Sequence, residues 1–191
     1  RALRWIRENI AEFGGDPWFV AASGGSAGGH LSSLLGLTAG DPEYQPGFEG
    51  LDTSLRACVP FYGVYDLCGR YGLQAQHGVD SFFARLVMKK RFADEPDAFC
   101  RASPMHRIHA DAPPFFVIHG SHDSLASVEE ARQFAKLLRE TSKAPVAYAE
   151  VPGAQHAFEV FHSQRTTHVT RAVGRFLGHV HSQYLRERGL T

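Results

Sequence analysis

FVAASGGSAGGHL, residues 19–31, runs from an apolar segment into a Gly-x-Ser-x-Gly motif and on into a helical pattern. A sharp turn from a strand into a helix lifts the serine hydroxyl clear of the sheet, where it can act as a nucleophile. Gly24 and Gly28 stand where we expect any side chain to collide with the crowded backbone of this elbow. Ser26 is therefore the candidate nucleophile. The N–H of Ala27, at the start of the helix, is a candidate donor to a developing oxyanion.

A Gly-x-Ser-x-Gly motif also occurs by chance, because glycine and serine are common residues. Its surroundings favour the functional interpretation, since Trp18 to Ala22 predicts a strand before it and a helical pattern follows. The apolar-side positions of that helix are Leu31, Leu34, Leu35 and Thr38. Nucleotide-binding loops are excluded, because no lysine follows the glycines and their spacing does not match the dinucleotide fingerprint.

The size and charge of the chain set limits on its class. It has 191 residues, of which 43% are hydrophobic and 21% charged, with a net charge of zero at pH 7. This length accommodates one domain with a substantial core, so we treat residues 1–191 as a single catalytic portion. Without an excess of positive charge, nucleic acid is not an expected partner. No apolar run reaches the roughly 18 residues that a bilayer requires, and no secretory signal opens the chain.

The beginning of the chain points to a fragment or a processed form. Arg1 stands in place of an initiator methionine, and an amphipathic helix from about Ala2 to Phe13 follows at once. We expect this portion to be soluble and cytoplasmic. The location of a longer parent protein stays unknown at this point, and membrane attachment through an upstream segment is left open.

Strand patterns alternate with helical patterns along the chain, which predicts the α/β class with a parallel, layered sheet and right-handed crossovers. The expected strands are Trp18–Ala22, Leu55–Phe61, Phe115–His119 and Val146–Val151. After the elbow helix, further helices are expected over Ser127–Thr141, with Ser127 as N-cap, and over Ser163–Glu187. Residues 62–114 are the least regular stretch. We expect them to include a lid or substrate wall, with helical patterns near Ser81–Lys90 and Pro96–Ala102.

A nucleophilic serine needs a base, and the base needs a group that orients it. In a parallel sheet these partners belong at the carboxyl ends of later strands. Asp123 follows the strand 115–119 and His156 follows the strand 146–151, which gives the chain order Ser, Asp, His. Asp66 is a rival for the carboxylate, because it follows the preceding strand.

His156 is one of eleven histidines in the chain. His30, His119 and His122 also lie near the expected site. His156 is favoured as the base, because a glycine-containing loop after a late strand leaves its ring free to swing toward Ser26.

The spacing of the other histidines and of the cysteines predicts neither a metal site nor a disulfide framework. Two His-x-x-His pairs, made by His106, His109, His119 and His122, suggest a metal site, but no acidic or cysteine ligand completes the set. We predict no metal and no other cofactor. Cys58, Cys68 and Cys100 show no paired or metal-type spacing, so we expect no disulfide framework and a buried Cys58.

Together these motifs resemble the hormone-sensitive-lipase-like carboxylesterases of the α/β-hydrolase superfamily, bacterial lipase and esterase members above all. The resemblance lies in four segments in one order, residues 5–17, 26–29, 119–132 and 155–158. It implies a partial α/β-hydrolase fold and hydrolysis of small-molecule esters or lipids with short to medium acyl chains through an acyl-enzyme. It also implies that Ser26 is the nucleophile, His156 the general acid and base, and Asp123 the orienting carboxylate.

The chain departs from the pattern of this family in two places. Gly25 precedes the serine where members usually carry an acidic residue, and the His-Gly-Gly-Gly loop that supplies further oxyanion amides does not occur in the sequence. Loss of one oxyanion donor costs about 2.7–4 kcal/mol in a related context. We therefore expect this chain by itself to be a weak catalyst or none.

The same resemblance implies that the strand before the serine pairs, on its far side, with a strand of a missing N-terminal half. The segment 18–22 would then be an open apolar edge, and such edges seek partners. We expect the chain to bind that N-terminal half or to associate with itself. Two other functions stay open on the same fold, namely a catalytically silent binding or regulatory module, and an amidase or peptidase that uses the same triad.

Overall fold

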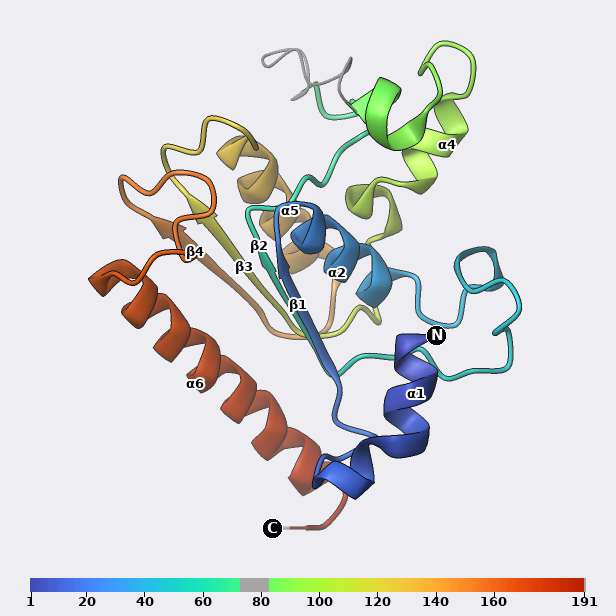
Figure 1. Cartoon of the computed structure of the whole chain (residues 1–191), viewed down its shortest axis with the longest axis vertical. Coiled ribbons are helices and arrows are strands. Elements are labelled where there is room, and N and C mark those ends of the chain that lie inside the picture. The colour runs from blue at the N-terminus through green and yellow to red at the C-terminus, as the bar shows by residue number, and fades with distance from the viewer. Residues whose placement is uncertain (73–82, 191) are drawn as a thin grey trace.

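The computed structural model describes residues 1–72 and 83–190. Its centre is a four-stranded sheet in the order β1-β2-β3-β4, in which every neighbouring pair is parallel. The strands are β1 (Ala21–Gly25), β2 (Ala57–Phe61), β3 (Phe115–Gly120) and β4 (Val146–Val151). Sequence order and spatial order coincide, so each strand lies beside its successor (Figure 1). The predicted α/β class with a parallel sheet is confirmed.

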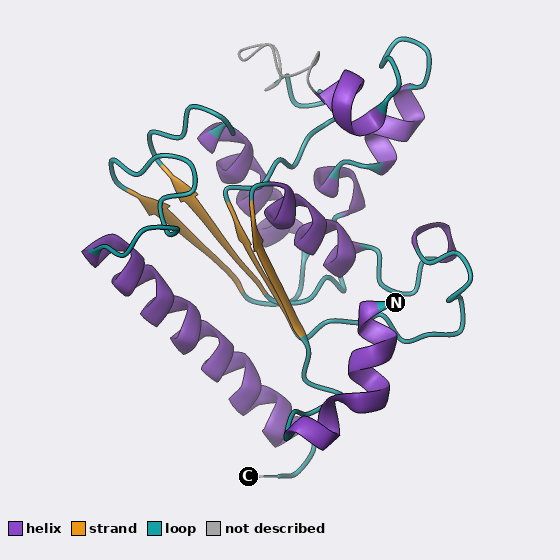
Figure 2. Cartoon of the chain, in the orientation of Figure 1, coloured by secondary structure: helices purple, strands orange, loops and turns teal. Residues whose placement is uncertain are grey.

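Helices cover both faces of this sheet (Figure 2). The described α-helices are α1 (Ala2–Asn9), α2 (Ala27–Leu37), α4 (Pro96–Arg101), α5 (Val128–Thr141) and α6 (Gln164–Glu187), of which α4 does not cover the sheet. Short 3₁₀ helices lie at Ile10–Phe13, Pro42–Tyr44 and Pro104–Arg107. In Figure 1, α6 runs along one face, whereas α2 and α5 lie on the opposite side.

The alternation of side chains along β3 explains the two layers. Phe115 and Val117 belong to the core that includes Phe134 of α5, because successive side chains of a strand point to opposite faces. Phe116 and Ile118 belong to the second core, against which the partly buried side chains of α6 pack. β3 is buried along its whole length, as its continuous apolar run predicts for a strand covered on both faces.

β1 begins later than the sequence predicts. The carboxylate of Asp16 accepts a hydrogen bond from the N–H of Trp18 at 2.8 Å, which forms a turn, and the N–H of Arg56 reaches the carbonyl of Val20 at 2.7 Å. Residues 18–20 therefore lead into the sheet, and the paired ladder starts at Ala21. The strand at the edge is made of small residues rather than of the bulky apolar side chains expected there.

The first helical segment is also divided. α1 ends at Asn9 and continues as a 3₁₀ helix to Phe13, which Gly14 terminates with a φ of 78°. The last two helices lie within one residue of their predicted bounds. Ser163 caps α6 by accepting a hydrogen bond from the N–H of Thr166, whereas Ser127 occupies the N-cap position of α5 without a side-chain capping bond.

Residues 83–101 lie beyond the ends toward which the strands point (Figure 1), whereas Tyr65, Met105 and Ala112 pack into the core beneath the sheet. The helix expected over Ser81–Lys90 lies partly outside the described residues, and its described part, Phe83–Met88, is a π-helix. Pro96–Arg101 forms α4, close to the predicted Pro96–Ala102.

The expectation about the cysteines is wrong in part. Cys68 and Cys100 form a disulfide over a sequence separation of 32 residues. Spacing alone did not indicate this pair, because the excursion folds back on itself and brings α4 beside the segment that follows β2. The N–H of Cys68 donates to Ser103 Oγ at 2.9 Å, and the N–H of Met105 donates to the carbonyl of Tyr65 at 3.0 Å. Cys58 is a buried free cysteine, as predicted.

Among the helices that the structure describes, none combines the length and the apolar character needed to cross a bilayer.

Candidate active site

The turn around Ser26 has the geometry of a nucleophile elbow. Ser26 has a φ of 56° and a ψ of −115°, a conformation that non-glycine residues seldom adopt and that costs free energy. Its N–H donates to the carbonyl of Phe61 at 3.0 Å, which fixes the elbow against the end of β2. A Cβ on Gly24 would lie 2.7 Å from the carbonyl carbon of Gly28, so Gly24 is sterically required, as predicted. The prediction for Gly28 is wrong, since a Cβ there meets no atom within 4 Å. The backbone of Gly28 therefore leaves no room for a side chain at position 24, whereas position 28 itself has room for one.

The start of α2 places free backbone amides beside Ser26. Ala27 is the first residue of α2, so its N–H is one of the four amides that have no acceptor within a helix. The side chain of Ser26 makes no capping bond to these amides. The hydroxyl is therefore not engaged by the helix, and the positive end of the helix dipole lies beside it.

The loops after β3 and β4 bring an acid and a base together. β3 and β4 are paired up to Gly120 and Val151, so the two loops leave the sheet side by side. His156 Nδ1 donates to Asp123 Oδ2 at 2.7 Å. The rival carboxylate, Asp66, instead accepts the N–H of Tyr71 at 3.0 Å. The structure thus joins His156 to Asp123, the pair that the sequence favoured.

Asp123 is held as a carboxylate by hydrogen bonds from several directions. Burial of the group opposes ionisation, but donors from His119, the N–H of Ala126, His156 and the N–H of Leu125 outweigh it and lower the pKa of Asp123 to about 2. Both N–H groups lie 2.9 Å from Oδ1. Oδ2, which accepts from His156, also lies 3.3 Å from His119 Nε2. A carboxylate fixed in this way can orient an imidazole and stabilise its positive charge.

The other histidines near the site are occupied differently. His30 Nε2 lies 2.7 Å from the carbonyl of Ala102, and burial lowers the pKa of its ring. His119 is fully buried and its Nε2 donates to the carbonyl of Ala126 at 3.1 Å. His122 Nδ1 lies 3.2 Å from Ser121 Oγ. Of the four, His156 is the one whose ring nitrogen makes a short bond to a carboxylate.

The His-x-x-His pairs do not come together as one ligand set. Within residues 1–72 and 83–190, the group whose ligand atoms lie close enough for a metal ion consists of Cys68, Cys100 and His106, and its two sulfur atoms are joined in the disulfide.

Tyr62 lies beside both the candidate base and the residue that precedes the candidate nucleophile. Among the hydrogen bonds of the described residues, none joins Ser26 Oγ to His156, a bond that is often long in free enzymes and tightens with substrate. The ring centroids of Tyr62 and His156 are 4.5 Å apart, and the Tyr62 hydroxyl lies 2.4 Å from the position of a Cβ on Gly25. One side chain therefore contacts the base and also borders the residue before the nucleophile.

Sequence reasoning missed Tyr62, Glu159 and Gly29. Tyr62 directly follows β2 and Glu159 lies three residues after His156, so position at a strand end and nearness to the base were the available signals. Glycine is required at position 29 for a steric reason, since a Cβ there would lie 2.5 Å from the carbonyl oxygen of Phe61. A small residue is needed where α2 packs closely on the end of β2.

Comparison with known proteins gives concordant results. The family model BD-FAE matches residues 1–138. A Mycobacterium tuberculosis protein named "Probable carboxylic ester hydrolase LipM" is 50% identical over 183 residues, which are 95% of this chain and 42% of that protein. Esterase LipQ of the same organism is 44% identical over 188 residues, 98% of this chain and 44% of its own length. The chain thus spans less than half the length of these relatives.

Two solved structures with a similar fold are esterases. A thermophilic esterase from Thermogutta terrifontis with propionate bound superposes with a TM-score of 0.66 and 26% identity, over 99% of this chain and 63% of its own. A truncated carbohydrate esterase from gut microbiota gives a TM-score of 0.74 at 24% identity, over 93% of this chain and 66% of its own, a likeness of fold alone. The chain belongs to the BD-FAE family, and its sheet and flanking helices are those of a hormone-sensitive-lipase-like α/β-hydrolase of the carboxylesterase type.

Proposed function

We propose that this chain carries the catalytic triad of a serine carboxylesterase, with Ser26 as nucleophile, His156 as general acid and base, and Asp123 as orienting carboxylate. The observation that carries the proposal is the 2.7 Å bond from His156 Nδ1 to Asp123, made on the loops that follow β4 and β3. The strained elbow at Ser26 and the esterase names of the relatives support it.

The reaction follows from these positions. His156 Nε2 takes the proton of Ser26 as Oγ attacks the ester carbonyl, and Asp123 stabilises the imidazolium that results. The N–H of Ala27 donates to the oxyanion of the tetrahedral intermediate. His156 then protonates the leaving alcohol, which leaves an acyl-serine, and water attacks that ester with the same histidine as base. The substrates are esters of short to medium acyl chains, and the described parts of residues 62–114 form part of the wall that receives them.

A fluorophosphonate probe tests the nucleophile in the chain itself. We expect the probe to label Ser26, as located by mass spectrometry, and Ser26→Ala to remain unlabelled. Ser121→Ala, which removes a hydroxyl from the neighbouring loop, is the control and should be labelled like the unchanged protein. Labelling of Ser26→Ala would reject the assignment, and an unlabelled parent chain would favour a catalytically silent module.

The leaving group is tested separately, because the fold and triad do not fix it. We expect hydrolysis of p-nitrophenyl butyrate to exceed that of the matching p-nitroanilide. A faster reaction on the anilide would identify an amidase instead.

We also propose that upstream polypeptide covers the β1 edge, and that a second copy covers it when the chain is alone. β1 lies at the end of the strand order, and Leu31 and Leu35, one turn apart on α2, are 61% and 37% exposed. The relatives are more than twice as long as their matched part, so they have the chain length for such a cover. Light scattering should show association, which Leu31→Glu with Leu35→Glu removes and Leu190→Glu, at a comparably exposed leucine, does not. A monomeric parent chain would contradict this.

A further inference from the structure

Tyr62 holds an unusual place beside the candidate base. It follows β2 directly, its N–H donates to the carbonyl of Ile118 at 2.7 Å, and its φ of 35° is rare for a side chain of this size. The residue is 3% exposed, and its ring centroid lies 4.5 Å from that of His156 and 6.0 Å from that of Phe158. Backbone strain of this kind persists where the surroundings enforce it, and it is often found at functional sites.

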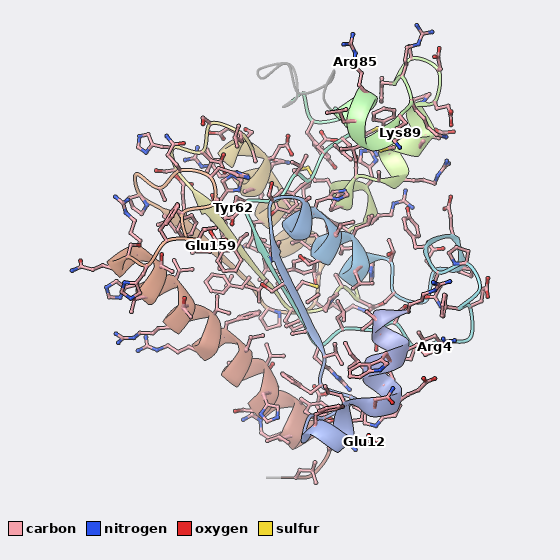
Figure 3. The ribbon with its side chains drawn as sticks, viewed as in Figure 1. Arg4, Glu12, Tyr62, Arg85, Lys89 and Glu159 are labelled. Carbon is pink, nitrogen blue, oxygen red and sulfur yellow. A yellow bond between two sulfur atoms is a disulfide. The ribbon has the colours of Figure 1, made fainter. Side chains whose placement is uncertain are left out.

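The hydroxyl of Tyr62 is tied to a carboxylate on the loop of the base. It donates to Glu159 Oε1, and the two residues lie close together where Figure 3 labels them. Burial, together with the nearby carboxylates of Glu159 and Asp123, raises the pKa of Tyr62, so the phenol keeps its proton and remains a donor. Glu159 Oε2 is buried without a hydrogen-bond partner among the described residues. The carboxylate is therefore directed at Tyr62 rather than at solvent.

The Tyr62–Glu159 pair links the loop that carries His156 to the elbow that carries Ser26. Glu159 lies three residues after His156, on a loop in which Ala157 also has a positive φ of 55°. On its other side, the Tyr62 hydroxyl lies 2.4 Å from where a Cβ on Gly25 would stand, so Tyr62 occupies the space of any side chain at the position before Ser26. The ring thus fills the volume between the elbow and the imidazole, and the hydrogen bond to Glu159 keeps it there.

We propose that Tyr62 and Glu159 are positioning residues that fix the imidazole of His156 in the orientation required for proton transfer with Ser26, and that Gly25 is glycine because Tyr62 fills its side-chain space. The inference rests on the proposed function of His156. Neither residue touches the reacting atoms. Their effect is on the geometry of the base, to which proton transfer is sensitive.

The first test measures the rate of fluorophosphonate labelling of Ser26 in matched variants. Tyr62→Phe removes the hydroxyl and keeps the ring, and Glu159→Ala removes the acceptor. Each should lower the second-order labelling rate about 10- to 100-fold, the loss that accompanies a misplacement of about 1 Å. Glu159→Gln should restore most of the rate, because its amide oxygen still accepts from the phenol.

A control separates positioning from stability. Tyr148 donates to Glu150 Oε2 at 2.9 Å on β4, so Tyr148→Phe removes a similar tyrosine–glutamate bond that does not involve His156. It should leave the labelling rate unchanged, and the melting temperature of every variant is recorded beside its rate. Gly25→Ala should slow labelling as Tyr62→Phe does, and the double variant should lose little more, because both changes disturb one contact. Additive losses, unchanged rates in Tyr62→Phe and Glu159→Ala, or an equal loss in Glu159→Gln would overturn the proposal.

A second readout does not depend on reaction at Ser26. The proton on His156 Nδ1, held in a short bond to a carboxylate, gives a downfield proton resonance that broadens when the ring moves and exchange with water increases. We expect this resonance in the parent chain and in Tyr148→Phe, and its broadening or loss in Tyr62→Phe and Glu159→Ala. If it is unchanged in these two variants, the positioning role is wrong. If the parent chain shows the resonance but no labelling, the proposed function fails while the positioning role is still judged by the spectrum.

Discussion

Two parts of the candidate site are held in different ways. The acid–base half consists of Asp123, His156 and the loops after β3 and β4. Asp123 follows β3, which is buried along its whole length, and its carboxylate accepts hydrogen bonds from side chains and backbone alike, whereas His156 follows β4, a largely half-buried strand at one edge of the sheet. The nucleophile half consists of β1, Ser26 and the start of α2. It lies at the other edge of the sheet, the residues of β1 are exposed or half-buried, and Leu31 is 61% exposed.

The difference shows which part of the chemistry this chain organises by itself. The acid and the base are fixed by neighbours within the 191 residues. The serine is strained by its own turn, but the edge beside it is uncovered. The proposed oxyanion donor, the N–H of Ala27, belongs to this sequence, which contains no His-Gly-Gly-Gly motif. We therefore expect disruption of the acid–base half to abolish reactivity, and disruption of the nucleophile half to act first on stability and association.

The largest effect is expected from breaking the acid–base half. Asp123→Asn should lower the fluorophosphonate labelling rate of Ser26 by about 10⁴-fold, because the imidazole loses both its tautomer and the partner for its positive charge. His156→Ala should reduce the rate at least as much. Labelling rates from gel fluorescence with intact-mass confirmation measure the change.

His122→Ala is the matched control for these variants, because His122 lies on the same loop as Asp123 but contacts Ser121. It should keep the rate of the parent chain. An Asp66→Asn variant that loses reactivity while Asp123→Asn keeps it would reverse the assignment of the acid.

A smaller effect is expected from a methyl group at the elbow. Gly24→Ala places a Cβ 2.7 Å from the backbone of Gly28 and should cost about 1–3 kcal/mol of unfolding free energy, as overpacking does. Gly28→Ala meets no atom within 4 Å and should be neutral or gain up to about 1 kcal/mol from better helix propensity. Urea unfolding compares the two. Equal losses of unfolding free energy in the two variants would contradict the prediction that a side chain collides at Gly24 but not at Gly28.

The smallest effect is expected on the free energy of unfolding at acid pH, through the ionisation of Asp123. The pKa of Asp123 is about 2 in the folded chain against an ordinary value of 3.8. Its contribution to stability is therefore fully present above about pH 4 and is lost as the pH falls through about 2. The difference in unfolding free energy between the parent chain and Asp123→Asn should shrink over this interval. A constant difference from pH 5 to pH 2 would show that the hydrogen bonds to Asp123 do not favour its charged form.

Much of the fold was accessible from the sequence because its signals are local. The run at 115–119 and the alternation of strands and helices predicted the parallel sheet, and β4 and α6 fall where periodicity indicated. The start of β1 was misplaced, because a turn closed by Asp16 takes up residues 16–19, and the apolar pattern does not indicate such a turn. The disulfide between Cys68 and Cys100 was missed for a related reason, since it depends on how a long irregular excursion folds back.

The candidate site likewise has some features that local sequence signals predict and others that depend on how distant segments pack. The order of Ser26, Asp123 and His156 follows from strand ends, and the bond between the last two agrees with it. The contacts of Tyr62 with His156 and Glu159 arise from a positive φ and from packing between two loops, neither of which leaves a periodic trace. The crowding at Gly24 was predictable. That a side chain at Gly28 would meet open space was not, because it depends on how closely the two backbone segments approach each other at each position.

The most direct test of the central claim is a crystal structure of the protein after reaction with the fluorophosphonate. We expect phosphorus bonded to Ser26 Oγ, a phosphoryl oxygen accepting a hydrogen bond from the N–H of Ala27, and His156 Nε2 within about 3 Å of the serine oxygen, the reach of a general base. Phosphorus on another residue, or an imidazole of His156 directed away from Ser26 while still bonded to Asp123, would contradict it.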